Sequence, residues 1–196
     1  MSDIKQAEFF NSLAKSWDAQ RARDDKRLTA FAAMLRLQPE DCVLDAGSGT
    51  GVLLPYLAPY VKRIAAVDFA EQMLAVAQAK NQQFTNIEYY AADILEFEPG
   101  YLFTKISCLN FYPHIKAKEV FLNKMAALLE PGGLLTIMHD ISRDQVNGVH
   151  AGCHNVAQDR LAAGQLEAER LRAAGFKINW CCDNDYYYYL QGEKLR

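Results

Sequence analysis

The chain has 196 residues, 51% of them hydrophobic, so it can bury one sizeable core and is short for two full domains. Its formal net charge of -3 disfavours a large nucleic-acid surface, and five cysteines without C-x-x-C spacing disfavour a disulfide framework or a structural zinc site. Without a signal-peptide profile or a long apolar run, we expect a soluble cytoplasmic protein that binds a small molecule, no nucleic acid and no membrane.

Helical and strand-like patterns alternate along the chain. Apolar residues recur at helical spacing over residues 7–19 and 25–37, which predicts two helices before the first strand. Strands are then expected at 42–45, 63–68, 87–91, 105–110 and 134–139, and helices at 52–59, 71–80 and 118–129. A polar loop over 140–163 precedes a last helix at 165–174, which Gly175 is placed to cap.

The C-terminal residues predict a hairpin. Two strands, 176–182 and 186–190, flank a short Asp/Asn turn at 183–185. Together with the five earlier strands they make seven. Because strands alternate with helices over the preceding part, we expect right-handed crossovers and a mostly parallel sheet covered on both faces.

The most informative stretch is V-L-D-A-G-S-G-T-G at residues 43–51, where an apolar strand leads into an acid and a glycine-rich turn. Glycines allow such a turn to tighten and bring its peptide groups close to a ligand. The spacing is G-x-G-x-G, whereas a dinucleotide fingerprint is G-x-G-x-x-G, and Asp45 would repel a pyrophosphate. The same acid suits a ligand with a cationic amino group.

This D-x-G-x-G-x-G stretch resembles the first motif of the class I S-adenosylmethionine-dependent methyltransferases. The resemblance extends from about residue 41 to the C-terminus, because the strand pattern also fits that class, whose last strand inserts antiparallel. It implies an α/β fold, a three-layer sandwich with a seven-stranded, mostly parallel sheet and an antiparallel C-terminal strand. It also implies one methyltransferase domain over 1–196, with a helical lid at 1–40 and a Rossmann-like core at 41–196, and S-adenosylmethionine as the cofactor.

Acids also end the second and third predicted strands. Asp68 is placed to accept hydrogen bonds from ribose hydroxyls, or else caps the next helix. Asp93 is placed to meet the adenine amine or is a turn acid, and Met73 lines the adenine or belongs to the core. The resemblance implies a cofactor site made of Asp45, Gly47, Gly49, Gly51, Asp68, Phe69, Met73, Asp93, Ile94 and Asn110.

Methyl transfer needs an aligned acceptor, exclusion of water and, for a protonated acceptor, a base. A lid is therefore expected, and the segment with Phe9, Phe10 and Trp17 resembles the one that covers the cofactor in many small members of this class. The alternative is an amphipathic helix docked on the sheet. Candidate substrate residues are Trp17, Tyr112 and Arg143.

Three of the four histidines lie in residues 138–154, which we call the histidine segment. One interpretation makes His139 or His150 a general base, with Arg143 holding an anionic substrate. A second has His139, Asp140, His150 and His154 bind a divalent metal, although our prediction assigns no metal site.

In the third interpretation the histidine segment is structural, and Arg143 pairs with a nearby acid. Gly148 and Gly152 weaken the prediction of a helix in this segment. Outside it, His114 follows Pro113 at the end of a predicted strand and is a further candidate base.

The function we expect is methyl transfer from S-adenosylmethionine to a small-molecule acceptor, by in-line displacement with a histidine base. Two alternatives stay open: a non-catalytic protein that binds an adenosyl ligand, and a methyltransferase that acts on a protein. The glycine spacing disfavours a nicotinamide-dependent oxidoreductase. The acceptor atom and the oligomeric state do not follow from the sequence.

Overall fold

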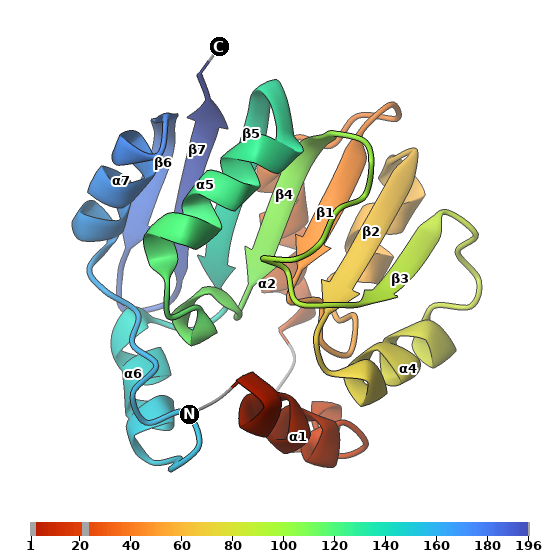
Figure 1. Ribbon diagram of the computed structural model, residues 1–196, viewed down its shortest axis with the longest axis vertical. Coiled ribbons are helices and arrows are strands. Elements are labelled where there is room, and N and C mark those ends of the chain that lie inside the picture. The colour runs from red at the N-terminus through yellow and green to blue at the C-terminus, as the bar shows by residue number, and fades with distance from the viewer. Residues whose placement is uncertain (1–2, 21–23, 196) are drawn as a thin grey trace. The chain divides into compact units, whose positions relative to one another are not determined.

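The computed structural model describes residues 3–20 and 24–195, in two compact units, Met1–Glu98 and Pro99–Arg196 (Figure 1). We call these the first unit and the second unit. Each contributes parallel strands and the helices that pack on them. The single domain expected over 1–196 stays a prediction.

The first unit has a parallel sheet in the order β3-β2-β1. Ile64 pairs with Val43 on one side and Ile87 on the other, and all three side chains are buried, which explains the nearly continuous apolar runs. The elements are α1 (Asp3–Leu13), η1 (Asp18–Gln20), α2 (Asp25–Met34), β1 (Cys42–Ala46), α3 (Leu54–Leu57), η2 (Ala58–Tyr60), β2 (Arg63–Asp68), α4 (Glu71–Lys80) and β3 (Ile87–Ala91).

The second unit has a mixed sheet in the order β4-β5-β7-β6. β4 and β5 run parallel, and β7 is antiparallel to both of its neighbours. Helices α5 and α7 pack beside each other (Figure 1). The elements are β4 (Phe103–Leu109), η3 (Tyr112–His114), α5 (Lys118–Leu128), β5 (Leu129–His139), α6 (Arg143–Ala151), α7 (Gly164–Ala173), β6 (Phe176–Asp183) and β7 (Tyr188–Lys194).

The predicted fold class is confirmed. The two units supply seven strands that are mostly parallel, with the last strand, β7, inserted antiparallel, and helices flank them. None of the helices in the described part of the chain combines the length and apolar character needed to cross a membrane.

The largest difference from the sequence prediction is in the expected polar loop at 140–163. Residues Arg143–Ala151 form helix α6, so the loop prediction was wrong there. Ser142 and Gln145 form a capping box, each side chain bonding the other residue's backbone N–H. This satisfies two donors at the helix start, whereas Gly148 costs only about 1 kcal/mol relative to alanine. The S-R-D-Q pattern was the signal that indicated a helix.

Several element boundaries also differ from the prediction. Helix α1 ends at Leu13 instead of near residue 19. Strand β5 begins at Leu129, which pairs with Phe103 before the register shifts along the Pro-Gly-Gly stretch. Strand β7 begins at Tyr188 rather than at 186, because the Asn184 side chain accepts hydrogen bonds from two backbone N–H groups and closes a turn over 184–187.

Candidate functional site

In the first unit, the glycine-rich turn follows β1 and lies against the end of β2. Gly47, Gly49 and Gly51 all have positive φ, between 54° and 71°, a conformation that side chains with a Cβ rarely adopt. The N–H groups of Gly47 and Ser48 both donate to the Val67 carbonyl, at 2.9 and 3.0 Å. The turn is therefore fixed to the carboxyl end of β2.

Two of these glycines have different surroundings. A Cβ on Gly51 would come within 2.8 Å of the Ala77 Cβ and of the Leu54 Cδ1, so this glycine permits close packing. A Cβ on Gly49 would meet no described atom within 4 Å. The Ser48 hydroxyl is buried and has no hydrogen-bond partner among the described residues. Open backbone beside an unsatisfied polar group fits a bound polar ligand.

Asp68, the last residue of β2, holds the turn from the other side. Its two carboxylate oxygens accept from the N–H of Gly49, at 2.8 Å, and from the N–H of Ala70, at 2.9 Å. Burial raises the pKa of Asp68 to about 6, and the nearby charge of Asp45 adds to this increase. The carboxylate thus joins the glycine turn to the start of α4 without capping the first turn of that helix.

An aromatic cluster covers the neighbouring part of the first unit. Phe10 lies edge-on to Trp17, with ring centroids 5.6 Å apart, and to Phe69 at 6.1 Å. Met73 is buried in the same cluster, beside Ala14. Phe69 and Met73, the predicted adenine wall, are therefore packed with the segment predicted to be a lid.

Polar contacts fix this segment to the glycine turn and to α4. The Asn11 side chain accepts from the Gln72 N–H, at 2.9 Å, in the first turn of α4. Asp18 accepts from the Thr50 hydroxyl at 2.6 Å and pairs with the Lys80 ammonium. The segment is thus docked on the glycine turn and α4, and its role as a lid stays a prediction.

Asp93 and Ile94 follow β3. The Asp93 side chain is exposed and accepts from the Leu95 N–H, at 2.9 Å, as a turn acid does. Ile94 is buried. Ala91 at the end of β3 pairs with Asp68, so both acids lie at the same edge of the sheet. Contact of Asp93 and Ile94 with adenine stays a prediction.

In the second unit, Asn110 directly follows β4 in a left-handed conformation, with φ of 54°. Its N–H donates to the Met138 carbonyl at 2.9 Å. Its side-chain amide donates to the Asp140 carboxylate at 2.8 Å and accepts from the Asp140 N–H at 3.3 Å. This pair joins the carboxyl ends of β4 and β5, where ligands bind in parallel sheets.

The candidate histidine bases lie in two different environments. His139, at the end of β5, is buried with its ring edge-on to Tyr188, centroids 6.0 Å apart. His114 and His150 lie together, with ring centroids 5.0 Å apart. Asp159 joins them: its carboxylate is 2.7 Å from His114 Nδ1, and its carbonyl is 2.7 Å from His150 Nδ1.

Two candidate substrate residues have structural partners. Arg143 forms an ion pair with Asp183 at 3.1 Å and a longer one with Asp144 at 3.4 Å, as the structural interpretation of the histidine segment expected. Tyr112 is fully buried, and its hydroxyl donates to the Glu167 carboxylate at 2.7 Å. Both side chains hold elements of the second unit together, and their expected contacts with substrate stay predictions.

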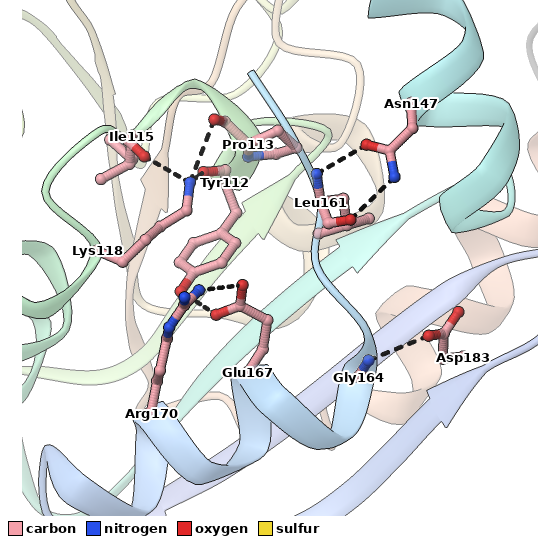
Figure 2. Close-up of polar contacts among 10 residues, drawn as sticks. All are labelled: Tyr112, Pro113, Ile115, Lys118, Asn147, Leu161, Gly164, Glu167, Arg170 and Asp183. Atoms are coloured by element: carbon pink, nitrogen blue, oxygen red, sulfur yellow. Dashed lines mark hydrogen bonds and ion pairs between the residues drawn. The ribbon is translucent and has the colours of Figure 1, made fainter. Parts of the chain in front are cut away.

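A buried polar network surrounds Tyr112 (Figure 2). Glu167 also accepts from Arg170, at 2.7 Å. The Lys118 ammonium donates to the carbonyls of Tyr112, Pro113 and Ile115 and lies 4.4 Å from the centre of the Tyr112 ring. Burial lowers the pKa of Lys118 to about 8, against the opposing charges of Glu167 and Asp159. Neither Lys118 nor Glu167 was predicted from the sequence.

The metal interpretation gains no support. Within residues 3–20 and 24–195, no three His, Cys, Asp or Glu side chains are grouped to hold an ion. His154 lies beyond the end of α6 and is exposed, so it does not share a helical face with His150. The Nδ1 atom of His150 is instead bonded to a carbonyl.

Comparison with known proteins agrees with this geometry. A methyltransferase domain family matches residues 43–133. Nodulation protein S of Sinorhizobium fredii is 25% identical over 175 residues, covering 82% of this chain and 81% of that protein. The ubiquinone biosynthesis O-methyltransferase of Coxiella burnetii is 34% identical over 95 residues, 47% of this chain and 41% of that enzyme.

Among solved structures, the N-methyltransferase NodS of Bradyrhizobium japonicum, in complex with S-adenosyl-L-homocysteine, has a TM-score of 0.76. The similarity covers 98% of each chain at 16% identity, which shows a shared fold. The fold and the glycine turn define the class I methyltransferase architecture. The chain is thus similar to S-adenosylmethionine-dependent methyltransferases, and these similarities support a methyltransferase with S-adenosylmethionine as its cofactor.

Proposed function

We propose that this protein transfers the methyl group of S-adenosylmethionine to a small-molecule acceptor. The observation that carries the proposal is the glycine turn of the first unit, whose Gly49 is open to a ligand and is held by the Asp68 carboxylate. The similar proteins point the same way, because one is an N-methyltransferase and another an O-methyltransferase of ubiquinone biosynthesis. Neither name defines the acceptor of this chain.

The residues of the turn fit the cofactor. Backbone N–H groups at a strand end suit its polar methionine part, and a carboxylate at Asp68 suits its ribose hydroxyls. We propose that the cofactor is bound by Asp45, Gly47, Gly49, Gly51, Asp68, Phe69, Met73, Asp93, Ile94 and Asn110. In this arrangement Trp17 and Phe10 exclude water from the aromatic cluster beside Phe69.

The reaction is an in-line displacement. The acceptor oxygen or nitrogen forms a bond to the methyl carbon while the carbon–sulfur bond breaks, and the electron pair of that bond stays on sulfur. The proton of the acceptor passes to a histidine. Among His114, His139 and His150, we favour His114, because its Nδ1 is hydrogen-bonded to a carboxylate that stabilises a protonated imidazole.

Cofactor binding and turnover test this function separately. Isothermal titration should detect binding of both S-adenosylmethionine and S-adenosylhomocysteine; if folded protein binds neither, the function is wrong. With methyl-deuterated cofactor and a metabolite extract, mass spectrometry should find an acceptor that gains one labelled methyl group. Binding without any such product would favour the non-catalytic alternative, and label on protein would favour a protein substrate.

The base is tested by matched histidine variants. His114→Gln should lower the methylation rate by at least about 100-fold, the usual contribution of a general base, and leave cofactor affinity unchanged. His154→Gln is the control, because His154 is exposed. Normal turnover of His114→Gln together with loss in His139→Gln would assign the base to His139 instead.

Cofactor affinity should also depend on pH through Asp68. Its pKa is raised to about 6, so the carboxylate that accepts from ribose hydroxyls becomes protonated below that pH. Affinity for S-adenosylmethionine should therefore weaken as pH falls below about 6, by up to about tenfold per pH unit. Asp68→Asn should bind weakly at every pH, and Asp93→Asn should keep the wild-type pH dependence. A pH-independent affinity in the wild type would contradict the role of Asp68.

A further inference from the structure

Asp159 makes contacts with two candidate bases at once. Its Oδ2 is 2.7 Å from His114 Nδ1, and the side chains of both residues are largely buried, with 11% and 13% exposed. Its backbone carbonyl is 2.7 Å from His150 Nδ1. The two imidazole rings lie 5.0 Å apart with an angle of 38° between their planes. One residue thus fixes the orientation of both rings.

These contacts also decide where the ring protons lie. A backbone carbonyl can only accept a hydrogen bond, so Nδ1 of neutral His150 must carry the proton and its lone pair is on Nε2. An ionised carboxylate is likewise only an acceptor, which gives neutral His114 the same tautomer. Both imidazoles therefore have their basic nitrogen at Nε2.

We propose that Asp159 is the positioning residue of the reaction, which holds His114 with Nε2 ready to take a proton from the acceptor. This inference rests on the proposed function and deepens it. When the acceptor loses its proton to Nε2, the carboxylate of Asp159 stabilises the positive charge that forms on the ring. Such a base favours acceptors whose nucleophile carries a proton, an O–H or N–H group.

Hydrogen bonds fix the backbone close to both members of the His114–Asp159 pair, and Figure 2 shows these bonds. On the His114 side, Lys118 donates to the carbonyls of Pro113 and Ile115, which flank the histidine. On the Asp159 side, the Asn147 side chain bonds both the N–H and the carbonyl of Leu161, at 2.9 and 3.0 Å. The histidine and the carboxylate are therefore positioned before a substrate binds, as efficient proton transfer requires.

Several charged or titratable groups surround His114. On its own turn lies Tyr112, on α5 Lys118, and on α6 His150. Helix α7 contributes Glu167 and Arg170, which bond each other, and Glu167 accepts from Tyr112. The Asp159 carboxylate lies 2.7 Å from Nδ1 of the His114 ring. Removing this acceptor in Asp159→Ala should thus change the His114 tautomer.

Long-range ¹H–¹⁵N NMR of the full, ¹⁵N-labelled chain tests this proposal without cofactor or acceptor. In their neutral form, His114 and His150 should both show protonated Nδ1. Asp159→Ala should shift His114 toward the other tautomer, because its acceptor is lost, and leave His150 unchanged. The exposed Asp185→Asn is the control. Protonated Nε2 on wild-type His114, or an unchanged tautomer in Asp159→Ala, would overturn the proposal.

Asp159→Asn provides the second readout and replaces Asp159→Ala if that variant does not fold. Its amide oxygen still accepts from Nδ1, so the tautomer should be retained. The negative charge that stabilises the protonated ring is lost, so methylation of the acceptor found above should slow by about tenfold or more. Unchanged turnover would overturn the positioning role. Failure of cofactor binding would refute the proposed function and leave the tautomer result intact.

Discussion

Replacing Gly51 with alanine should lower the free energy of unfolding by about 2 to 5 kcal/mol, from left-handed backbone strain and overpacking. Gly51 has φ of 71°, and an added Cβ would lie 2.8 Å from the Ala77 Cβ and the Leu54 Cδ1. The Ala77 Cβ can move only with the backbone of α4, and Leu54 is fully buried. Neither neighbour can therefore move without disturbing the backbone or the packed core. Urea denaturation followed by circular dichroism measures the loss.

Gly49→Ala separates cofactor binding from folding. The residue has φ of 54°, but an added Cβ would meet no described atom within 4 Å, so only backbone strain of about 1 to 2 kcal/mol is expected. The methyl group would occupy the face of the turn that we assign to the cofactor. Affinity for S-adenosylmethionine should therefore fall while the fold is retained.

Gly132→Ala is the matched control for both variants. Gly132 has φ of 80° and equally open surroundings, far along the chain from the glycine turn. It should show similar backbone strain without loss of cofactor affinity. If Gly51→Ala is no less stable than Gly132→Ala, the packing argument is wrong. If Gly49→Ala binds the cofactor as tightly as wild type, the turn does not bind the cofactor in the way we propose.

The features predicted well from the sequence were local ones. The glycine turn follows from a run of nine residues, and apolar runs located strands such as β1, β2 and β4 because these are almost entirely buried. Asp68 was found because it ends such a strand. Its bond to the Gly49 N–H, 19 residues away, was not predictable, because it depends on how β1 and β2 pair.

The missed residues act through contacts between distant parts of the chain. Asp159 lies 45 residues from His114, in a stretch with no periodic pattern, so nothing near it indicated a partner. Glu167 lies in a recognisable helix, but that helix is rich in charged residues, so the sequence did not distinguish Glu167 from the exposed ones. Only the packing of α7 makes its side chain fully buried. Helix α6 was missed because two glycines were weighted above a capping box.

Glu167→Ala should strongly destabilise the second unit, lowering the free energy of unfolding by about 2 to 4 kcal/mol through an unsatisfied buried donor and a cavity. Glu167 has no exposed surface and accepts from Tyr112 and Arg170, each at 2.7 Å. Burial and the Glu167 charge raise the pKa of the Tyr112 hydroxyl, so it keeps its proton and needs an acceptor. Arg170 is partly exposed and can turn to water.

Two further variants separate the effect of the lost hydrogen bond from the effect of the lost side-chain volume. Glu167→Gln keeps the size and an acceptor oxygen for Tyr112, so it should cost about half as much as the alanine variant. Glu169→Ala, on the exposed face of the same helix, should change stability by no more than about 0.5 kcal/mol. Urea titrations of all three proteins measure these differences. If Glu167→Ala has the same free energy of unfolding as Glu169→Ala, the network around Tyr112 does not stabilise the fold. The turn that carries His114 would then be supported by the Lys118 hydrogen bonds alone.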